Sequence, residues 1–316
     1  MESLKPKIAI IGAGNVGSTF AFSLMISGLA REIVLIDKND LLARGECMDL
    51  NHGLSLAHPT KIYAAGFEGC KNADIVVITA GENQKPGQTR IDLVNANVLL
   101  FKDIIPAITK YAGNAILLVV TNPVDILTYV TLKLSGLPPN RVIGSGTVLD
   151  TARLKYMISE YCTVDPSNIH AYIIGEHGDT ELPVWSNATI AGMDIESYCS
   201  TYSKKINAKT DLSEIFEKVK NAAYQIIKAK GATNYSIALA LVKITRSIVR
   251  NENSILPVST LINDYYGISD VCISIPSHVN INGVEQYLKL ELSDTEQDQF
   301  KHSANTLKNI LKTIIV

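Results

Sequence analysis

The chain has 316 residues, 47% of them hydrophobic and 19% charged, and its formal net charge is −2. This length suits two domains or one large domain with a sizeable core, and a nearly balanced charge without a long basic run argues against binding to nucleic acid or to an anionic membrane. The five cysteines form no CxxC pair and the six histidines no HxxxH or HxxEH spacing, which argues against a disulfide framework and against a metal site and fits a reduced, cytoplasmic compartment.

The first predicted elements surround a glycine-rich turn. Residues 8–17 read IAIIGAGNVG, in which a β-branched run precedes three glycines in GxGxxG spacing. Uncharged, helix-compatible sequence continues to Ala30, and a second strand is predicted at Ile33–Ile36, ending at Asp37. This order of strand, glycine turn, helix, strand and acid is typical of dinucleotide-binding sites.

Each residue of this motif has a physical role in such a site. Gly12 permits the tight turn, Gly14 lets the backbone approach a pyrophosphate, and Gly17 lets the helix pack closely on its strand. The carboxylate of Asp37 would accept hydrogen bonds from an adenosine ribose and would repel a 2′-phosphate, so the sequence predicts NAD rather than NADP. A signal peptide or membrane helix is the alternative for the uncharged residues 8–30, but glycines and small polar residues interrupt them and their apolar density is too low for a span.

Two further strands are predicted in the first half, at Ala73–Thr79 and Ala115–Thr121, with helical spacing at residues 93–111 between them. Such alternation predicts a parallel sheet with helices on both faces, and ligands of these sheets bind beyond the carboxyl ends of the strands. The predicted strand ends, which we expect to converge on one crevice, lie at Gly12–Gly17, Asp37, Ala80-Gly81 and Thr121-Asn122-Pro123.

The second half changes character after about residue 145, where long helical patterns and then β-rich segments follow. We expect a doubly wound parallel domain at residues 1–145 and an α+β domain at residues 146–316, packed as one rigid unit with a cleft between them. The predicted elements are helices at Ser213–Lys230 and Ala232–Arg250, separated at Gly231, strands at Val258–Ile262, Val271–Ile275 and Val284–Leu292, a hairpin turn at Asn282-Gly283, and a helix from a capping box of Ser293 and Glu296 through Ile314.

A histidine and an ion pair form the candidate reactive set. His177 is flanked by glycines in the run IIGEHGDTELPVW, while Asp150 and Arg153 lie three residues apart, on one face of a helix if this segment is helical. A glycine-flanked histidine is usually structural. A histidine, a carboxylate that orients it and an arginine that grips an anion are, however, the parts that move a proton beside a bound carboxylate.

Residues 80–92, AGENQKPGQTRID, interrupt the helix and strand pattern and carry Gln84, Lys85 and Arg90. A solvated surface loop is the simpler interpretation. The position of the segment directly after a predicted cofactor-binding strand favours a mobile loop beside the crevice instead.

Taken together, six segments resemble those of bacterial L-lactate dehydrogenases, within the lactate/malate dehydrogenase superfamily. The resemblance covers nearly the whole chain from Lys7, and we expect no N-terminal arm of the vertebrate type. It implies an N-terminal Rossmann domain, a C-terminal α+β catalytic domain, a cytoplasmic homotetramer, and NADH-dependent reduction of pyruvate to (S)-lactate as the last step of anaerobic glycolysis. The segments are GAGNVG, AGENQKPGQTR, TNPVDILTYV, RVIGSGTVLDTAR, IIGEHGDTELPVWS and NENSILPVST.

The resemblance also implies a role for each residue of the site. His177 would donate a proton to the carbonyl oxygen of pyruvate, and Asp150 would hold the imidazole in one tautomer and raise its pKa, so that it titrates near neutrality. Arg153 would bind the substrate carboxylate, and Arg90 would polarise the carbonyl. The remaining implied contacts are Asn122 and Thr233 to the substrate, and Gly12, Gly14, Val16, Gly17, Asp37, Gly81, Thr121, Asn122 and Ser145 to the cofactor.

Two positions bear on specificity and regulation. Malate-type relatives carry arginine where this chain has Gln84, and a second substrate carboxylate would be left without a charge partner there, so we expect lactate rather than malate. Many bacterial relatives bind fructose 1,6-bisphosphate through an arginine and a histidine, and this chain has Lys155 and His170 at those positions. Another 2-hydroxyacid dehydrogenase and a non-catalytic NAD-binding protein are the alternative interpretations, although the intact charged set argues against the second.

Overall fold

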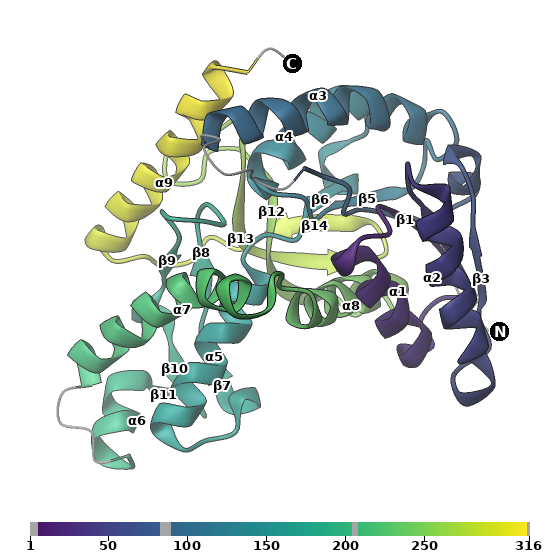
Figure 1. The fold of residues 1–316 in the computed structure, drawn as a ribbon. Helices are drawn as coiled ribbons and strands as arrows, with labels where there is room; N and C mark the ends of the chain where they lie inside the picture. Colours follow the sequence, from purple (N-terminus) through teal and green to yellow (C-terminus); the bar gives the residue numbers. More distant parts are fainter. Residues whose placement is uncertain (1–5, 83–89, 204–207, 315–316) are drawn as a thin grey trace.

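The computed structural model describes residues 6–82, 90–203 and 208–314 (Figure 1). Its centre is a nine-stranded sheet in the order β14-β13-β12-β6-β5-β4-β1-β2-β3. The six strands from β6 to β3 pair in parallel, which confirms the doubly wound sheet expected from the sequence. These strands are β1 (Lys7–Ile11), β2 (Glu32–Ile36), β3 (Lys61–Ala64), β4 (Ile75–Ile78), β5 (Ile116–Val119) and β6 (Val142–Gly144).

Helices cover both faces of this sheet, because alternate strand residues point to opposite sides. Ile8 and Ile10 of β1 join a buried apolar cluster with α1, α2 and α8, whereas Ala9 and Ile11 join another with α3, α4 and α9. None of the described helices has the length and apolarity needed to cross a bilayer. The bounds are α1 (Asn15–Ser27), α2 (Asp40–His52), α3 (Arg90–Thr109), α4 (Val124–Ser135), α8 (Tyr235–Val249) and α9 (Asp294–Lys312).

Three antiparallel strands from the C-terminal half extend the same sheet: β12 (Ser254–Ile262), β13 (Val271–Asn280) and β14 (Gly283–Tyr287). They join it where Ser259 of β12 pairs with Gly144 of β6. A Cβ at Gly144 would lie 2.4 Å from the hydroxyl of Thr128 and 2.8 Å from the Cβ of Ser259, so this junction requires glycine. The two halves of the chain therefore share one continuous sheet.

A separate lobe is built on α5 and α7, which pack against each other around an apolar cluster that includes Leu154, Ile190 and Leu212. Beside it, the short strands β8 and β9 pair in a hairpin whose loop, residues 175–181, contains His177. The bounds here are α5 (Val148–Cys162), β7 (Ile169–His170), β8 (Ile173–Ile174), β9 (Leu182–Pro183), β10 (Thr189–Ile190), β11 (Met193–Asp194), α6 (Ile195–Thr201) and α7 (Ala208–Lys230).

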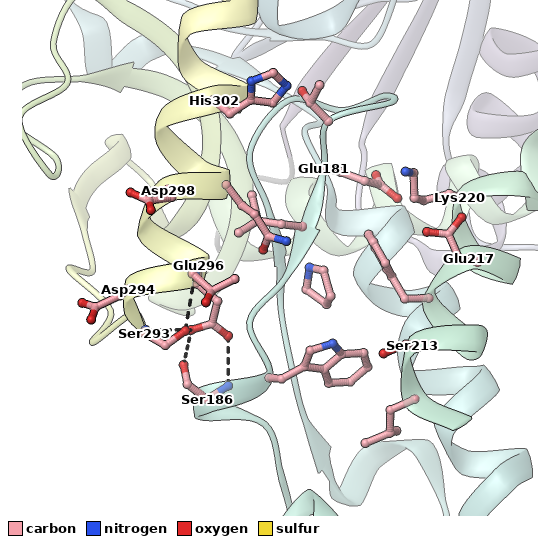
Figure 2. Close-up of a pocket in the computed structure, with 18 of the residues that line it drawn as sticks. Glu181, Ser186, Ser213, Glu217, Lys220, Ser293, Asp294, Glu296, Asp298 and His302 are labelled. Carbon is pink, nitrogen blue, oxygen red and sulfur yellow. Dashed lines mark hydrogen bonds between the residues drawn. The ribbon is translucent and has the colours of Figure 1, made fainter. Parts of the chain in front are cut away.

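Between β9, α7 and α9 lies a cavity of about 1200 Å³, which we call the outer hollow (Figure 2). Its walls combine apolar side chains such as Trp185 and Phe216 with charged ones such as Glu181 and Lys220. Glu296 at the start of α9 closes one side, where its carboxylate accepts hydrogen bonds from the backbone N–H and the hydroxyl of Ser186 at 3.1 and 2.6 Å.

Several predicted element ends are corrected by tertiary contacts. Helix α7 begins at Ala208 rather than Ser213, because Leu212 is buried in the lobe and continues the apolar stripe upstream. Helix α8 begins at Tyr235 rather than Ala232, because Asn234 has a non-helical backbone and its side chain donates to the hydroxyl of Thr19 in α1 at 2.9 Å. The capping box before α9 is confirmed.

The C-terminal hairpin also differs from its prediction. Its turn residues are Ile281 and Asn282, because Asn280 pairs with Gly283 to close the hairpin. Gly283 has φ +96°, and a Cβ there would lie 1.8 Å from the carbonyl oxygen of Asn140, so the glycine is required by this contact rather than by the turn itself. Strand β14 ends at Tyr287 rather than residue 292, because the chain then leaves β13 and donates backbone N–H groups to the tyrosine hydroxyls of residues 265 and 266.

Candidate active site

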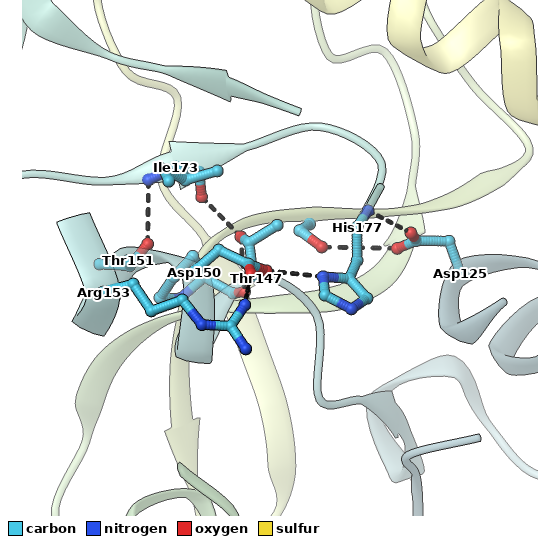
Figure 3. A network of polar contacts seen from close by, with 9 residues as sticks. Asp125, Thr147, Asp150, Thr151, Arg153, Ile173 and His177 are labelled. Atoms are coloured by element: carbon cyan, nitrogen blue, oxygen red, sulfur yellow. Dashed lines mark hydrogen bonds and ion pairs between the residues drawn. The ribbon is translucent and has the colours of Figure 1, made fainter. Parts of the chain in front are cut away.

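The ion pair and the histidine found in the sequence meet in one place (Figure 3). Asp150 lies in the first turn of α5, and its Oδ1 accepts a hydrogen bond from Nη1 of Arg153 at 2.7 Å. Its Oδ2 lies 2.6 Å from Nδ1 of His177. The Asp150 side chain is only 4% exposed, whereas that of His177 is 26% exposed. A buried carboxylate therefore orients a partly accessible imidazole, whose Nε2 is left for other partners.

The loop that carries His177 is held from three sides. The backbone N–H of His177 donates to Oδ2 of Asp125 in α4 at 2.7 Å, and Ser274 of β13 donates its hydroxyl to the other oxygen of Asp125. Gly175 exchanges backbone hydrogen bonds with Ser274, and Ser303 of α9 accepts from the backbone N–H of the next residue. Asp125 was not among the predicted site residues, although it lies in the segment TNPVDILTYV.

Charge around His177 sets its protonation. Burial by itself would lower the pKa of His177, but the charge and hydrogen bond of Asp150, with the charges of Glu181 and Asp125, outweigh it and raise the pKa to about 9. The expectation of titration near neutrality is thus corrected upward, because three carboxylates surround the ring. Burial opposes ionisation of Asp150 as well, yet His177 and Arg153 together keep its pKa below the usual value.

A cavity of about 460 Å³, the inner hollow, opens beside this set. Asn122, Asp150, Arg153 and His177 all line it, which brings four of the predicted site residues together. The opposite wall comes from α7, through residues that include Tyr224 and Ile227. Asn122 precedes a cis peptide bond to Pro123, and its carbonyl accepts a hydrogen bond from the side chain of Asn97 at 2.9 Å.

A second cavity of about 380 Å³ lies at the carboxyl ends of β1, β2 and β4 and is lined by Gly12, Gly14, Asp37 and Gly81. At Gly12 (φ +104°) a Cβ would lie 2.7 Å from the backbone nitrogen of residue 80, and at Gly17 it would lie 1.9 Å from the carbonyl oxygen of Gly12. A Cβ at Gly14 would meet nothing within 4 Å, so open space lies in front of the N-terminus of α1. This arrangement fits a pyrophosphate.

The acidic end of this cavity is also fixed. Asp37 accepts backbone hydrogen bonds from Ala13 at 2.7 Å and from Asn39 at 2.8 Å, which holds its carboxylate at the end of β2. Its position in the cavity fits a ribose, so these residues fit NAD. Thr121 and Ser145 support the strand ends instead of lining the cavity, since the Thr121 hydroxyl donates to the carbonyl of residue 80 at 2.7 Å and the Ser145 N–H to that of residue 119 at 2.8 Å.

The remaining predicted site residues either lie outside the described residues or are not among the described residues that line the two cavities. Gln84 and Lys85 lie outside the described residues, and Arg90 is the first residue of α3. The others lie in the described part of the chain. Val16 in α1 is partly buried against the cluster beside α8, and Thr233, between α7 and α8, is half-buried and is not among the residues that line the inner hollow. Lys155 is half-buried on α5, where burial lowers its pKa, and His170 is exposed on the adjacent β7.

One functional candidate was missed. Glu181 lies in the same loop as His177 and is 7% exposed, and burial together with the charge of Asp150 raises its pKa to about 8. Glu181 lies in the run IIGEHGDTELPVW, four residues after His177. This spacing does not predict that the two side chains are close, because they are brought together only when β8 and β9 pair and fold the loop back.

Comparison with known proteins agrees with this geometry. The chain is 56% identical over 308 residues to L-lactate dehydrogenase of Acetivibrio thermocellus, covering 98% of this chain and 97% of that one, and 53% identical over 302 residues to that of Priestia megaterium, covering 96% and 94%. The solved structure of the minor L-lactate dehydrogenase of Enterococcus mundtii superposes with a TM-score of 0.95 at 40% identity and 99% coverage of both chains.

Family models match both halves. Residues 6–144 match the NAD binding domain of lactate/malate dehydrogenase, and residues 147–315 match its alpha/beta C-terminal domain. With the glycine turn, the fixed Asp37 and the pair of Asp150 and His177 in place, the chain belongs to the lactate/malate dehydrogenase family of NAD-dependent oxidoreductases.

Proposed function

We propose that this protein interconverts pyruvate and L-lactate with NAD as its cofactor. The observation that carries this proposal is the His177 ring, which is fixed by Asp150 at 2.6 Å in the same hollow as Arg153. A proton donor and an anion-binding guanidinium side by side suit a 2-oxo acid, which presents a carbonyl next to a carboxylate.

Each of the predicted residues that line the inner hollow has a separate role in the proposed reaction. The chemistry that the nicotinamide supplies when bound is hydride transfer. Because Nδ1 of His177 is bonded to Asp150, Nε2 is the atom that gives a proton to the carbonyl oxygen in reduction and accepts the hydroxyl proton in oxidation. Arg153, whose Nη1 is anchored on Asp150, binds the substrate carboxylate, and Asn122, which lines the same hollow, donates a further hydrogen bond to the substrate. Arg90 and Thr233 complete the proposed contacts.

Specificity for pyruvate over oxaloacetate rests on Gln84, which offers no charge to a second carboxylate. The experiment is NADH oxidation measured with each 2-oxo acid in turn. We expect kcat/KM for pyruvate to exceed that for oxaloacetate by at least about a hundredfold, since an unpaired buried charge costs several kcal/mol. Equal rates would reject the lactate assignment in favour of a malate-type enzyme.

A homotetramer is proposed for the assembly, and an exposed apolar surface supports it. Phe22 and Ile26 of α1, Leu41 and Met48 of α2 and Leu239 of α8 are each about half exposed or more. Buried residues of α1, α2 and α8 share one apolar cluster, so the three helices cover the same face of the sheet. Exposed apolar side chains on such a face are typical of interaction surfaces. Light scattering should give four times the mass of the chain.

Regulation by fructose 1,6-bisphosphate is proposed through Lys155 and His170, which lie on the packed elements α5 and β7. Burial lowers the pKa of Lys155, and a phosphate there would favour its charged form. We expect the bisphosphate to lower KM for pyruvate and K155A to abolish this effect; no effect on the unsubstituted protein would reject the site.

We further propose that the chain divides into two domains between residues 145 and 146, and that the protein acts in the cytoplasm in lactate fermentation.

A further inference from the structure

Glu181 stands in the wall between the inner hollow and the outer hollow. Four charged side chains line both cavities: Asp179, Glu181, Glu217 and Lys220. Of these, Glu181 is the buried one, at 7% exposure, and Figure 2 shows it beside Lys220. The partition between the catalytic cavity and the outside thus contains one buried carboxylate.

The Glu181 carboxylate is close to the reacting pair without being bonded to it. One of its oxygens, a ring nitrogen of His177 and a carboxylate oxygen of Asp150 all lie within 4.8 Å of one another. Among the described residues, none makes a hydrogen bond to this carboxylate, and no oxygen of Glu181 is among the fully buried polar atoms that lack a partner, so the carboxylate is accessible to water. Since these atoms are no more than 4.8 Å apart, one water molecule can bridge Glu181 and His177.

The electrostatic surroundings of Glu181 come from three elements. Asp150 and Arg153 face it from α5, His177 and Asp179 from its own loop, and Glu217 and Lys220 from α7, while His302 of α9 lines only the outer hollow. The cations Arg153 and Lys220 favour its charged form, and Asp150 opposes it. The carboxylate is therefore able to hold either state.

We infer that Glu181 carries protons between His177 and the solvent of the outer hollow during turnover. This inference rests on the proposed function, because the proton concerned is the one that L-lactate releases. Glu181 acts through His177 and has no contact with the substrate, so it serves proton exchange rather than the chemical step.

The proton transfer from His177 to the solvent needs no reactant other than water. After lactate oxidation the His177 imidazolium gives up a ring proton to a bridging water, and this water passes one of its own protons to the Glu181 carboxylate. The neutral carboxylic acid then releases the proton to water in the outer hollow and regains its charge. In pyruvate reduction the same steps run in reverse. Burial and the charge of Asp150 raise the pKa of Glu181 toward that of His177, so that the carboxylate can accept a proton from the imidazolium as well as release one to water.

The test is single-turnover lactate oxidation in weak buffer near pH 9.5, where most of His177 is neutral and Glu181 is charged before the reaction, with NADH absorbance and a pH indicator followed together. In the unsubstituted protein we expect proton release to keep pace with NADH formation. In E181Q, NADH formation should stay within about threefold, because loss of the negative charge favours neutral His177, while proton release should become at least about tenfold slower. A small amine at low concentration should restore it, since a dissolved base can accept the proton in place of the missing carboxylate. The conservative variant E181D should release protons within about threefold of the unsubstituted rate.

The matched control is E217Q, which removes an exposed carboxylate from the same wall and should leave the two signals coupled. Proton release that still tracks NADH formation in E181Q would overturn the inference. So would an equal slowing of both signals in E181Q and E181D, because that pattern belongs to a structural role. Failure of the unsubstituted protein to form NADH from L-lactate would instead reject the proposed function.

Discussion

Replacement of Asp150 by asparagine should move the pH range in which the protein reduces pyruvate. The pKa of His177 is about 9, compared with an ordinary value of 6.5, and Asp150 provides the largest stabilisation of its charged form. This shift corresponds to about 3 kcal/mol of differential interaction between the two protonation states. In D150N the imidazolium loses that support, while burial still disfavours charge, so its pKa should fall to 6.5 or below.

The direction of the pH effect depends on the protonation state of His177 that pyruvate reduction needs. Pyruvate reduction requires the imidazolium, so kcat/KM should be constant below pH 9 in the unsubstituted protein and fall tenfold per unit above it. At pH 8 about nine-tenths of His177 is protonated in the unsubstituted protein and about 3% or less in D150N, which predicts a loss of at least about thirtyfold from protonation alone. The loss should shrink toward pH 6.

The assay is kcat/KM for pyruvate between pH 5.5 and pH 10, measured from NADH absorbance at subsaturating substrate. The position of the breakpoint separates this effect from damage to the anchoring of Arg153, which would reduce the rate at every pH by the same factor. A breakpoint that stays near pH 9 in D150N would refute the assignment of the raised pKa to Asp150.

Four other substitutions test the rest of the site. H177N should reduce turnover at least about a thousandfold while NADH affinity, measured by fluorescence, stays within about threefold, because the ring donates a proton and does not hold the cofactor; a near-normal rate would end the proposed mechanism. D37S should raise the ratio of NADP to NAD use, because it removes the charge that repels a 2′-phosphate, and an unchanged ratio would place Asp37 away from the ribose. Q84R should raise the oxaloacetate-to-pyruvate ratio of kcat/KM by at least about a hundredfold, and a change below about tenfold would show that Gln84 does not face the substrate. G17A should weaken NADH binding at least about tenfold, because its Cβ would lie 1.9 Å from the carbonyl oxygen of Gly12; unaltered affinity would show that the glycine turn is not the phosphate site.

The cofactor half could be predicted well because its signals are local. The spacing of Gly12, Gly14 and Gly17 requires a particular backbone path, and the path dictates where Asp37 lies. The β-rich runs predicted β4 and β5, and helical spacing predicted α3, each to within a few residues. These are segments whose partners are adjacent along the chain or fixed by the alternation of strand and helix.

The rest of the site depends on contacts between distant segments. Asp125 and Glu181 acquire their roles only when α4 and the β8–β9 loop meet around His177, and no spacing within either segment reveals this. The upward shift in the pKa of His177 has the same origin, since it needs three carboxylates from three places in the chain. The start of α8 was misplaced because Asn234 is held by Thr19, more than two hundred residues earlier.

The pairing of Ser259 with Gly144 has a consequence for synthesis of the chain. Strand β6 is synthesised long before β12, so until β12 is made the edge of β6 that faces away from β5 has no strand partner. An open strand edge of this kind is a template for other nascent chains. A fragment that ends near residue 145 should therefore aggregate when it is expressed alone, and it should remain in the soluble fraction when residues 146–316 are co-expressed with it. The C-terminal half thus protects the cofactor-binding half from aggregation.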